Sequence, residues 1–188
     1  GLPPGVFQLV VGPATDIGAE MLENPICRKI TFTGSTEVGK HLIRGAADQV
    51  TKLSLELGGH APVLVFADAD FDQAVEGALV AKVRNTGQSC IAANRIYVQR
   101  SIADQFQDAL ADRAQQLKIG DGLEPGVDIG PLIDRAALDN ALGQIEQAKA
   151  VGARVLCGGR RWEGGAGYFL EPTVLADVPP DADCMREE

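Results

Sequence analysis

Hydrophobic residues recur along this chain with two alternating periods. Short aliphatic and β-branched runs, which predict strands, are separated by longer stretches that show the 3.6-residue period of amphipathic helices. In the first third of the chain the predicted strands are residues 6–11, 28–33 and 51–57, and the predicted helices are residues 16–24 and 35–49. Strands joined by single helices form parallel, right-handed units. The pattern therefore predicts an α/β fold.

The same alternation restarts after Gly58 and Gly59, and this glycine pair predicts a domain boundary that separates residues 1–58 from residues 59–188. Beyond the glycine pair the predicted strands are residues 62–67 and 95–100, and the predicted helices are residues 70–85 and 101–116. A later helix carries Leu138, Leu142 and Ile145. The closing segments are residues 154–159 and 168–178. Ser101 and Asp104 are the expected capping pair of the helix at 101–116, whose apolar face carries Phe106 and Leu110.

Composition and charge exclude several classes of function. A chain of 188 residues with 45% hydrophobic residues can bury a sizeable core. Its net charge of −9 argues against a general affinity for nucleic acid or for an anionic membrane, and no apolar run is long enough to cross a bilayer. The cysteines and histidines show no CxxC pair and no metal-ligand spacing; they are Cys27, Cys90, Cys157, Cys184, His41 and His60.

These features favour a cytoplasmic protein without a metal site or a disulfide framework. The first residues contain neither a methionine nor a basic segment, and the last ones show neither a helix cap nor a closing strand. Both ends therefore have the character of cuts within a longer chain.

Gly34 and Ser35 stand where a predicted strand meets a predicted helix. A helix N-terminus offers unpaired N–H groups and the positive end of its dipole, and a glycine lets a phosphate group approach the backbone closely. The glycines at 34 and 39 form neither the GxGxxG fingerprint nor a P-loop. Taken alone, these residues favour a tight strand-to-helix turn over a phosphate site.

Glu56 lies near the end of an apolar strand, two residues before Gly58, the first glycine of the pair. Partial desolvation there would suit its carboxylate to act as a general base near neutral pH. A strand-end glutamate that points into water is the simpler interpretation of this residue alone. His60, which follows the glycines, is expected to make a local hydrogen bond rather than to take part in catalysis.

Cys90 follows a Gly-Gln-Ser turn at a break between a predicted helix and a predicted strand. A lone cysteine is usually a small buried hydrophobic residue. A nucleophilic cysteine instead needs nearby N–H donors or positive charge, together with access for a substrate. The turn at residues 87–89 could direct N–H groups at Cys90, and Arg84 is a nearby cation, so both interpretations stay open at this point.

The segments FTGSTEVG, LELGG and NTGQSC, in this order and with Glu56 34 residues before Cys90, resemble the aldehyde dehydrogenase superfamily. The similarity extends along the whole chain and includes IGDGL, DIGPLI and the segment from GARVLCGG to FLEPTVL. The final MREE is similar to the start of the family's E-x-F-G-P motif. The resemblance implies part of a Rossmann-type cofactor domain, at residues 1–58, followed by part of an α/β catalytic domain, at residues 59–188.

The resemblance also implies a role for each motif residue. Cys90 would be the nucleophile that forms a thiohemiacetal and then a thioester with the aldehyde, and Glu56 would activate the hydrolytic water. NAD or NADP would be the cofactor. Gly12, Gly34, Ser35 and Glu188 match positions at which the family binds it. Two family residues, the oxyanion-hole asparagine and the lysine at the adenosine ribose, belong to segments that precede Gly1.

The substrate class is inferred from RNTGQ and LGG-x-AP, which resemble succinate-semialdehyde dehydrogenases most closely. Arg84 would then pair with the distal carboxylate of the substrate, because a guanidinium can form a bidentate pair with it. The alternative is an arginine that only closes a helix through its dipole. The parent enzyme is expected to act on a small aldehyde as a homodimer or homotetramer.

Two other functions are alternatives to this one. One is a CoA-acylating aldehyde dehydrogenase, in which CoA takes the acyl group; Glu56 argues against it, because a base that activates water has little use there. The other is a folded, non-catalytic fragment that serves as a structural module.

Overall fold

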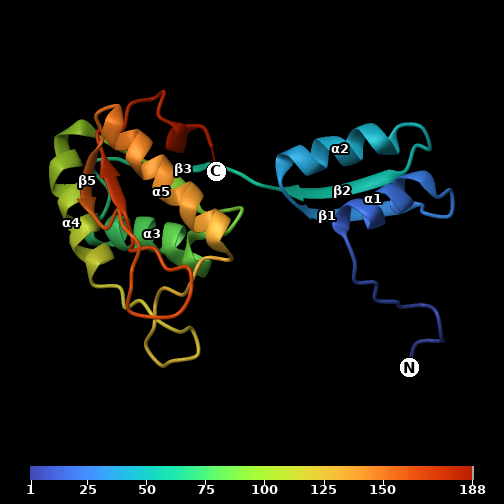
Figure 1. Ribbon diagram of the computed structural model, residues 1–188. Coiled ribbons are helices and arrows are strands. Elements are labelled where there is room, and N and C mark those ends of the chain that lie inside the picture. The colour runs from blue at the N-terminus through green and yellow to red at the C-terminus, as the bar shows by residue number, and fades with distance from the viewer. Residues whose placement is uncertain (188) are drawn as a thin grey trace. The chain divides into compact units, whose positions relative to one another are not determined.

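The computed structural model describes residues 1–187 and divides the chain into two compact units, Gly1–Gly58 and Gly59–Glu188 (Figure 1). The boundary between the units lies within the glycine pair Gly58-Gly59. None of the described helices has the length and the apolar character that a bilayer crossing requires.

The first unit contains one parallel pair of strands. Its elements are α1 (Ala14–Glu23), β1 (Lys29–Gly34), α2 (Thr36–Ala46) and β2 (Lys52–Leu57). β1 and β2 pair in parallel, with Thr33 opposite Glu56 and Gly34 opposite Leu57. As the alternating sequence predicts, α2 connects two neighbouring strands of one sheet.

One face of the β1–β2 sheet carries the core of this unit. Leu22 of α1, Ile30 of β1 and Leu42 of α2 are buried together, and Leu53 and Leu55 of β2 pack against them. Since successive strand residues point to opposite faces, Glu56 lies on the other face, which carries Lys52, Ser54 and the threonines of β1.

A glycine allows α2 to approach the sheet closely. A Cβ atom on Gly39 would lie 2.7 Å from Cδ2 of Leu57, well inside van der Waals contact. The second glycine of the segment GSTEVG therefore has a packing role in the structure.

The strand predicted at residues 6–11 is wrong. These residues form no strand, and the apolar side chains among them are exposed, with Phe7 at 80% and Val11 at 88%. A strand exists only through hydrogen bonds to a neighbouring strand. No strand in the described part of the chain pairs with this segment.

The second unit begins with another β–α–β arrangement. Its elements are β3 (Ala61–Val65), α3 (Phe71–Val83), the 3-10 turn η1 (Arg84–Gly87), β4 (Ala93–Val98), the 3-10 turn η2 (Arg100–Ile102), α4 (Ala103–Gln115), α5 (Arg135–Ala150), β5 (Arg154–Cys157), β6 (Val174–Ala176) and the 3-10 turn η3 (Asp183–Met185). β3 and β4 are parallel, whereas β5 and β6 are antiparallel.

The core of the second unit lies between α3, α4 and the two sheets. Val75 and Phe106 are its largest fully buried side chains, and Cys157 of β5 belongs to the same cluster. Phe71 packs edge-on against Phe106, with ring centroids 6.1 Å apart. The predicted apolar face of the helix at 101–116 is therefore confirmed: Phe106 and Leu110 are both buried.

The capping pair predicted for that helix is wrong. α4 begins at Ala103, its N-cap residue is Ile102, and no side chain caps it. Ser101 lies in the preceding 3-10 turn η2, so its hydroxyl is not at the N-cap position. The Asp104 carboxylate instead accepts a hydrogen bond from the Gln107 side chain at 3.3 Å.

Candidate active site

Cys90 lies in the connection between α3 and β4. Of the four cysteines, all of them within the described residues, Cys90 is the exposed one, whereas Cys157 is buried and the other two are partly buried. Burial raises the pKa of the Cys157 thiol above its ordinary value and also raises the pKa of Cys184. Accessibility therefore distinguishes Cys90 from the other thiols.

The residues before Cys90 form a turn with an unusual backbone. Asn85, Thr86 and Gly87 have φ angles of 54°, 56° and 74°, so three successive residues lie in the left-handed region. Asparagine and glycine tolerate this region, but a β-branched threonine is a genuine outlier there. The predicted turn at Gly87-Gln88-Ser89 thus begins earlier in the chain and is more constrained than the sequence indicated.

Hydrogen bonds hold this turn on both sides of Cys90. The Gln88 N–H donates to the carbonyl of Asn85 at 3.1 Å, and the Ala92 N–H donates to the carbonyl of Ser89 at 2.8 Å. The second bond spans Cys90 and fixes the backbone around its thiol.

Lys82, in the last turn of α3, reaches the same segment. Its Nζ donates to the carbonyl of Gly87 at 3.2 Å and to Oδ1 of Asn94 at 2.6 Å. The ammonium group therefore links the end of α3 to the turn before the cysteine and to the start of β4. Sequence reasoning missed Lys82 and Asn94, because a lysine in the last helical turn is ordinary at a surface.

Arg84 is the C-cap residue of α3, and it is exposed. Its backbone N–H donates to the carbonyl of Val80, and within the described residues its guanidinium makes no hydrogen bond or ion pair. Arg84 and Cys90 both lie in the connection between α3 and β4. The Arg84 guanidinium is accessible to an anionic ligand.

Gly34, Ser35 and Glu56 lie at the carboxyl end of the β1–β2 sheet in the first unit. Ser35 is the N-cap of α2, and its hydroxyl accepts a hydrogen bond from the Val38 N–H at 3.3 Å. Gly34 and Ser35 are both exposed, so the positive end of α2 is open to an anion, as a pyrophosphate site requires.

Glu56 is exposed, so within the described chain its carboxylate does not have the partly desolvated surroundings that a strand-end base was expected to have.

Gly12 precedes α1 and is exposed; a Cβ atom there would make only an ordinary contact with Ile17, at 3.6 Å. Glu188, the last predicted cofactor residue, lies outside the described residues.

His60 makes a long-range contact, so the expectation of a local hydrogen bond is wrong. Its Nε2–H donates to the carbonyl oxygen of Glu187 at 2.7 Å, and its own carbonyl accepts a bond from Arg95. Nδ1 of His60 and Nε of Arg95 are buried without a hydrogen-bond partner among the described residues. The two side chains thus connect the start of β3 to β4 and to the C-terminal segment.

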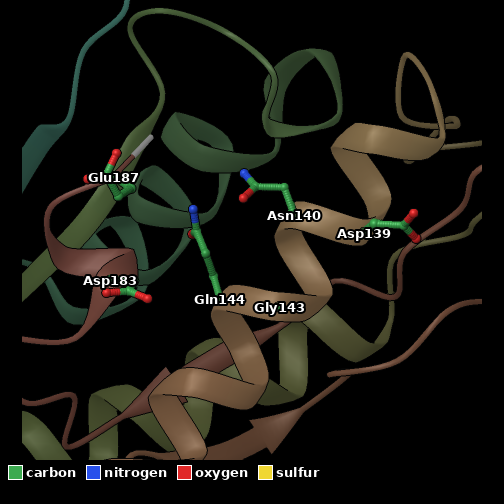
Figure 2. Close-up of a pocket in the computed structure, with 6 residues that line it drawn as sticks. All are labelled: Asp139, Asn140, Gly143, Gln144, Asp183 and Glu187. Carbon is green, nitrogen blue, oxygen red and sulfur yellow. The ribbon is translucent and has the colours of Figure 1, made fainter.

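A separate polar hollow of about 360 Å³ lies between α5 and the C-terminal segment (Figure 2). It is lined by Asp139, Asn140, Gly143, Gln144, Asp183 and Glu187. Its three carboxylates disfavour an anionic substrate or a pyrophosphate. None of the predicted site residues that the structure describes lines it, and the described residues contain no group of three or more His, Cys, Asp and Glu side chains that could hold a metal ion.

Comparisons with known proteins agree on one family. The model of the aldehyde dehydrogenase family matches residues 1–188. Over its whole length the chain is 51% identical to succinate-semialdehyde dehydrogenase (NADP+) of Escherichia coli strain K12. It is 50% identical to glutarate-semialdehyde dehydrogenase of Pseudomonas aeruginosa. The chain covers 39% of the length of each of these two relatives. The crystal structure of succinate-semialdehyde dehydrogenase from Burkholderia pseudomallei matches with a TM-score of 0.96 and 49% identity, over 100% of this chain and 39% of that one.

The chain thus spans about two fifths of the length of these relatives, and its fold agrees with that of the Burkholderia pseudomallei enzyme over the matched part. The family model matches the whole chain, residues 1–188. The exposed cysteine in its constrained turn and the open N-terminus of α2 agree with this match. This chain belongs to the aldehyde dehydrogenase family.

Proposed function

We propose that this chain supplies the nucleophile, the water-activating base and part of the cofactor site for NAD- or NADP-dependent oxidation of a semialdehyde to a carboxylate. Succinate semialdehyde is the first candidate substrate. The observation that carries the proposal is the exposed Cys90 thiol, which follows a constrained turn and lies six residues after the exposed Arg84. The names of the E. coli and P. aeruginosa relatives support a substrate with a distal carboxylate.

In the proposed reaction the Cys90 thiolate attacks the aldehyde carbonyl, and a C–S bond forms as the carbonyl π bond becomes a C–O⁻ bond. NAD or NADP, when bound, would supply the oxidant that takes the C–H electron pair as hydride. The carbonyl re-forms as a thioester on Cys90. Glu56 then removes a proton from a water molecule, whose oxygen adds to the thioester, and the Cys90 thiolate leaves as the carboxylic acid forms.

The N-terminus of α2 is proposed as the pyrophosphate site. Gly34 and Ser35 are exposed there, and the helix dipole favours negative charge at that end. Gly12, near the adenosine half, and Glu188, at the nicotinamide ribose, complete the proposed contacts. On this basis residues 1–58 are assigned to the cofactor domain and residues 59–188 to the catalytic domain, in a cytoplasmic enzyme that is a homodimer or homotetramer.

Arg84 is the proposed determinant of substrate class. Its guanidinium is exposed, makes no bond within the described residues and lies six residues before the nucleophile. A bidentate pair with a carboxylate is worth about 1.5–3 kcal/mol, which corresponds to roughly a 10- to 100-fold preference. Replacing Arg84 by methionine should therefore abolish most of the preference for succinate semialdehyde over butanal, which has the same length without the carboxylate.

The direct test is NAD(P)H formation from succinate semialdehyde by the 188-residue chain and by its Cys90→Ala and Cys157→Ala variants. The proposal expects the signal to vanish in Cys90→Ala and to persist in Cys157→Ala, because only Cys90 is exposed. Equal turnover in all three proteins would refute the nucleophile assignment. A complete lack of turnover in the unsubstituted chain would favour the alternative, a non-catalytic fragment, and CoA-dependent turnover would favour the acylating branch.

A further inference from the structure

The turn that carries Cys90 is bonded to a second loop, residues 129–133, which lies about forty positions further along the chain. The Gly130 N–H donates to Oγ1 of Thr86 at 3.2 Å. The Ile133 N–H donates to Oε1 of Gln88 at 2.9 Å. Both acceptors therefore belong to the segment that immediately precedes the cysteine.

The donor loop is itself anchored. The Ile129 N–H donates to the carbonyl of Lys118 at 3.1 Å, and the Leu132 N–H donates to the carbonyl of Tyr168 at 2.8 Å. Ile129 is buried, and Asp134 caps α5 through the Ala137 N–H at 2.8 Å. Residue 131 is a proline without an N–H, so every N–H group from 129 to 133 is used.

Two of these N–H groups fix the loop to the body of the second unit, and the other two reach the cysteine turn. The loop thus forms a fixed platform rather than a mobile connection. A platform of this kind can hold a neighbouring segment in a conformation that the segment would not adopt by itself.

The cysteine turn needs such support. Thr86 has a φ of 56°, and a β-branched residue is strained in the left-handed region, so this conformation persists only where surrounding contacts over-determine the backbone. The hydroxyl of this strained residue is the acceptor for Gly130. The Lys82 ammonium supports the next residue by its bond to the Gly87 carbonyl.

We propose that Thr86 and Gln88 are positioning residues that tie the cysteine turn to the loop at 129–133 and so hold the Cys90 thiol in its exposed position. The inference rests on the proposed role of Cys90 as the nucleophile. The geometry of this thiol then depends on two hydrogen-bond acceptors and on a loop outside the segments FTGSTEVG, LELGG and NTGQSC.

The test is amide hydrogen exchange in the 188-residue chain. The Ala92 N–H is the probe, because its bond to the Ser89 carbonyl spans Cys90. Thr86→Val keeps the shape and the β-branching but removes the acceptor, and Thr86→Ser keeps the hydroxyl. In the same way, Gln88→Met removes the acceptor oxygen, whereas Gln88→Glu keeps one. The Leu110 N–H in the core of α4 reports opening of the whole unit.

One lost hydrogen bond should accelerate exchange at Ala92 about five-fold in Thr86→Val and in Gln88→Met. Thr86→Ser and Gln88→Glu should stay within about two-fold of the unsubstituted chain, and Leu110 should not change in any variant. Unchanged exchange at Ala92 in both acceptor-removing variants would overturn the proposal. Equal acceleration at Ala92 and Leu110 would also overturn it, because the residues would then stabilise the unit as a whole.

The two proposals can fail separately. The exchange experiment needs no turnover. The positioning role of Thr86 and Gln88 can therefore be refuted while loss of NAD(P)H formation in Cys90→Ala still supports the proposed reaction. Conversely, accelerated exchange at Ala92 together with full activity in Cys90→Ala would support a clamped turn whose cysteine is not the nucleophile.

Discussion

Two glycine-to-alanine substitutions, ten residues apart, should change the stability of the second unit in opposite directions. Gly87 has a φ of 74°, a conformation that costs alanine about 1–2 kcal/mol. A Cβ atom there would lie 3.0 Å from Cε and 3.3 Å from the backbone oxygen of Lys82, so the lysine side chain must move. Its bond to the Gly87 carbonyl, worth about 1 kcal/mol, would then be lost.

The expected destabilisation for Gly87→Ala is therefore about 2–3 kcal/mol. Gly77 is the matched control, because it lies on the exposed side of α3 and a Cβ atom there would meet nothing within 4 Å. Alanine in a helix interior is more favourable than glycine by roughly 0.5–1 kcal/mol, so Gly77→Ala should stabilise the unit.

The assay is urea unfolding followed by tryptophan fluorescence. Trp162 is the single tryptophan, it belongs to the second unit, and it packs edge-on against Phe169 with centroids 5.1 Å apart, so its signal reports this unit and not the first. With a urea dependence of about 2 kcal/mol per molar, the midpoint should fall by roughly 1 M in Gly87→Ala and rise by a few tenths in Gly77→Ala. A Gly87→Ala midpoint equal to or above that of the unsubstituted chain would refute the left-handed turn before Cys90.

Two further predictions concern the core and the thiols. Phe106→Ala should destabilise the second unit by about 3–5 kcal/mol in the same urea assay, because Phe106 is 1% exposed, whereas Phe66→Ala, at 60% exposed, should cost less than about 1 kcal/mol. Limited alkylation at neutral pH, read by peptide mass spectrometry, should label Cys90 first, because its thiol is exposed. Cys157 should be labelled last, because burial raises the pKa of its thiol and keeps it protonated. Early labelling of Cys157 would contradict its position in the core.

Much of the fold could be predicted from the sequence because its signals are local. Each helix of the first unit and both of its paired strands lie where the hydrophobic pattern predicted them, to within a few residues. Alternating and 3.6-residue periods report which side of an element is buried, whatever its neighbours are. The same holds for the apolar face of α4.

Other features depended on partners that no local pattern names. The apolar run at residues 6–11 has the composition of a strand, but strand formation requires a paired neighbour. The helix start at Ala103 was displaced by a 3-10 turn, which leaves Ser101 without the predicted capping role. His60 bonds to a carbonyl 127 positions away, and only the folded chain brings the two together.

The motifs in the sequence by themselves identified the family of this protein, and their resemblance to that family predicted roles for Cys90, Glu56 and Arg84. Only the tertiary structure decided that Cys90 is the exposed cysteine and that three successive left-handed residues precede it. It also brought the N–H groups of Gly130 and Ile133 to Thr86 and Gln88. The physical reason is that backbone strain is maintained by contacts between residues distant in the sequence. The sequence shows a threonine at position 86 but does not indicate that its φ angle is positive.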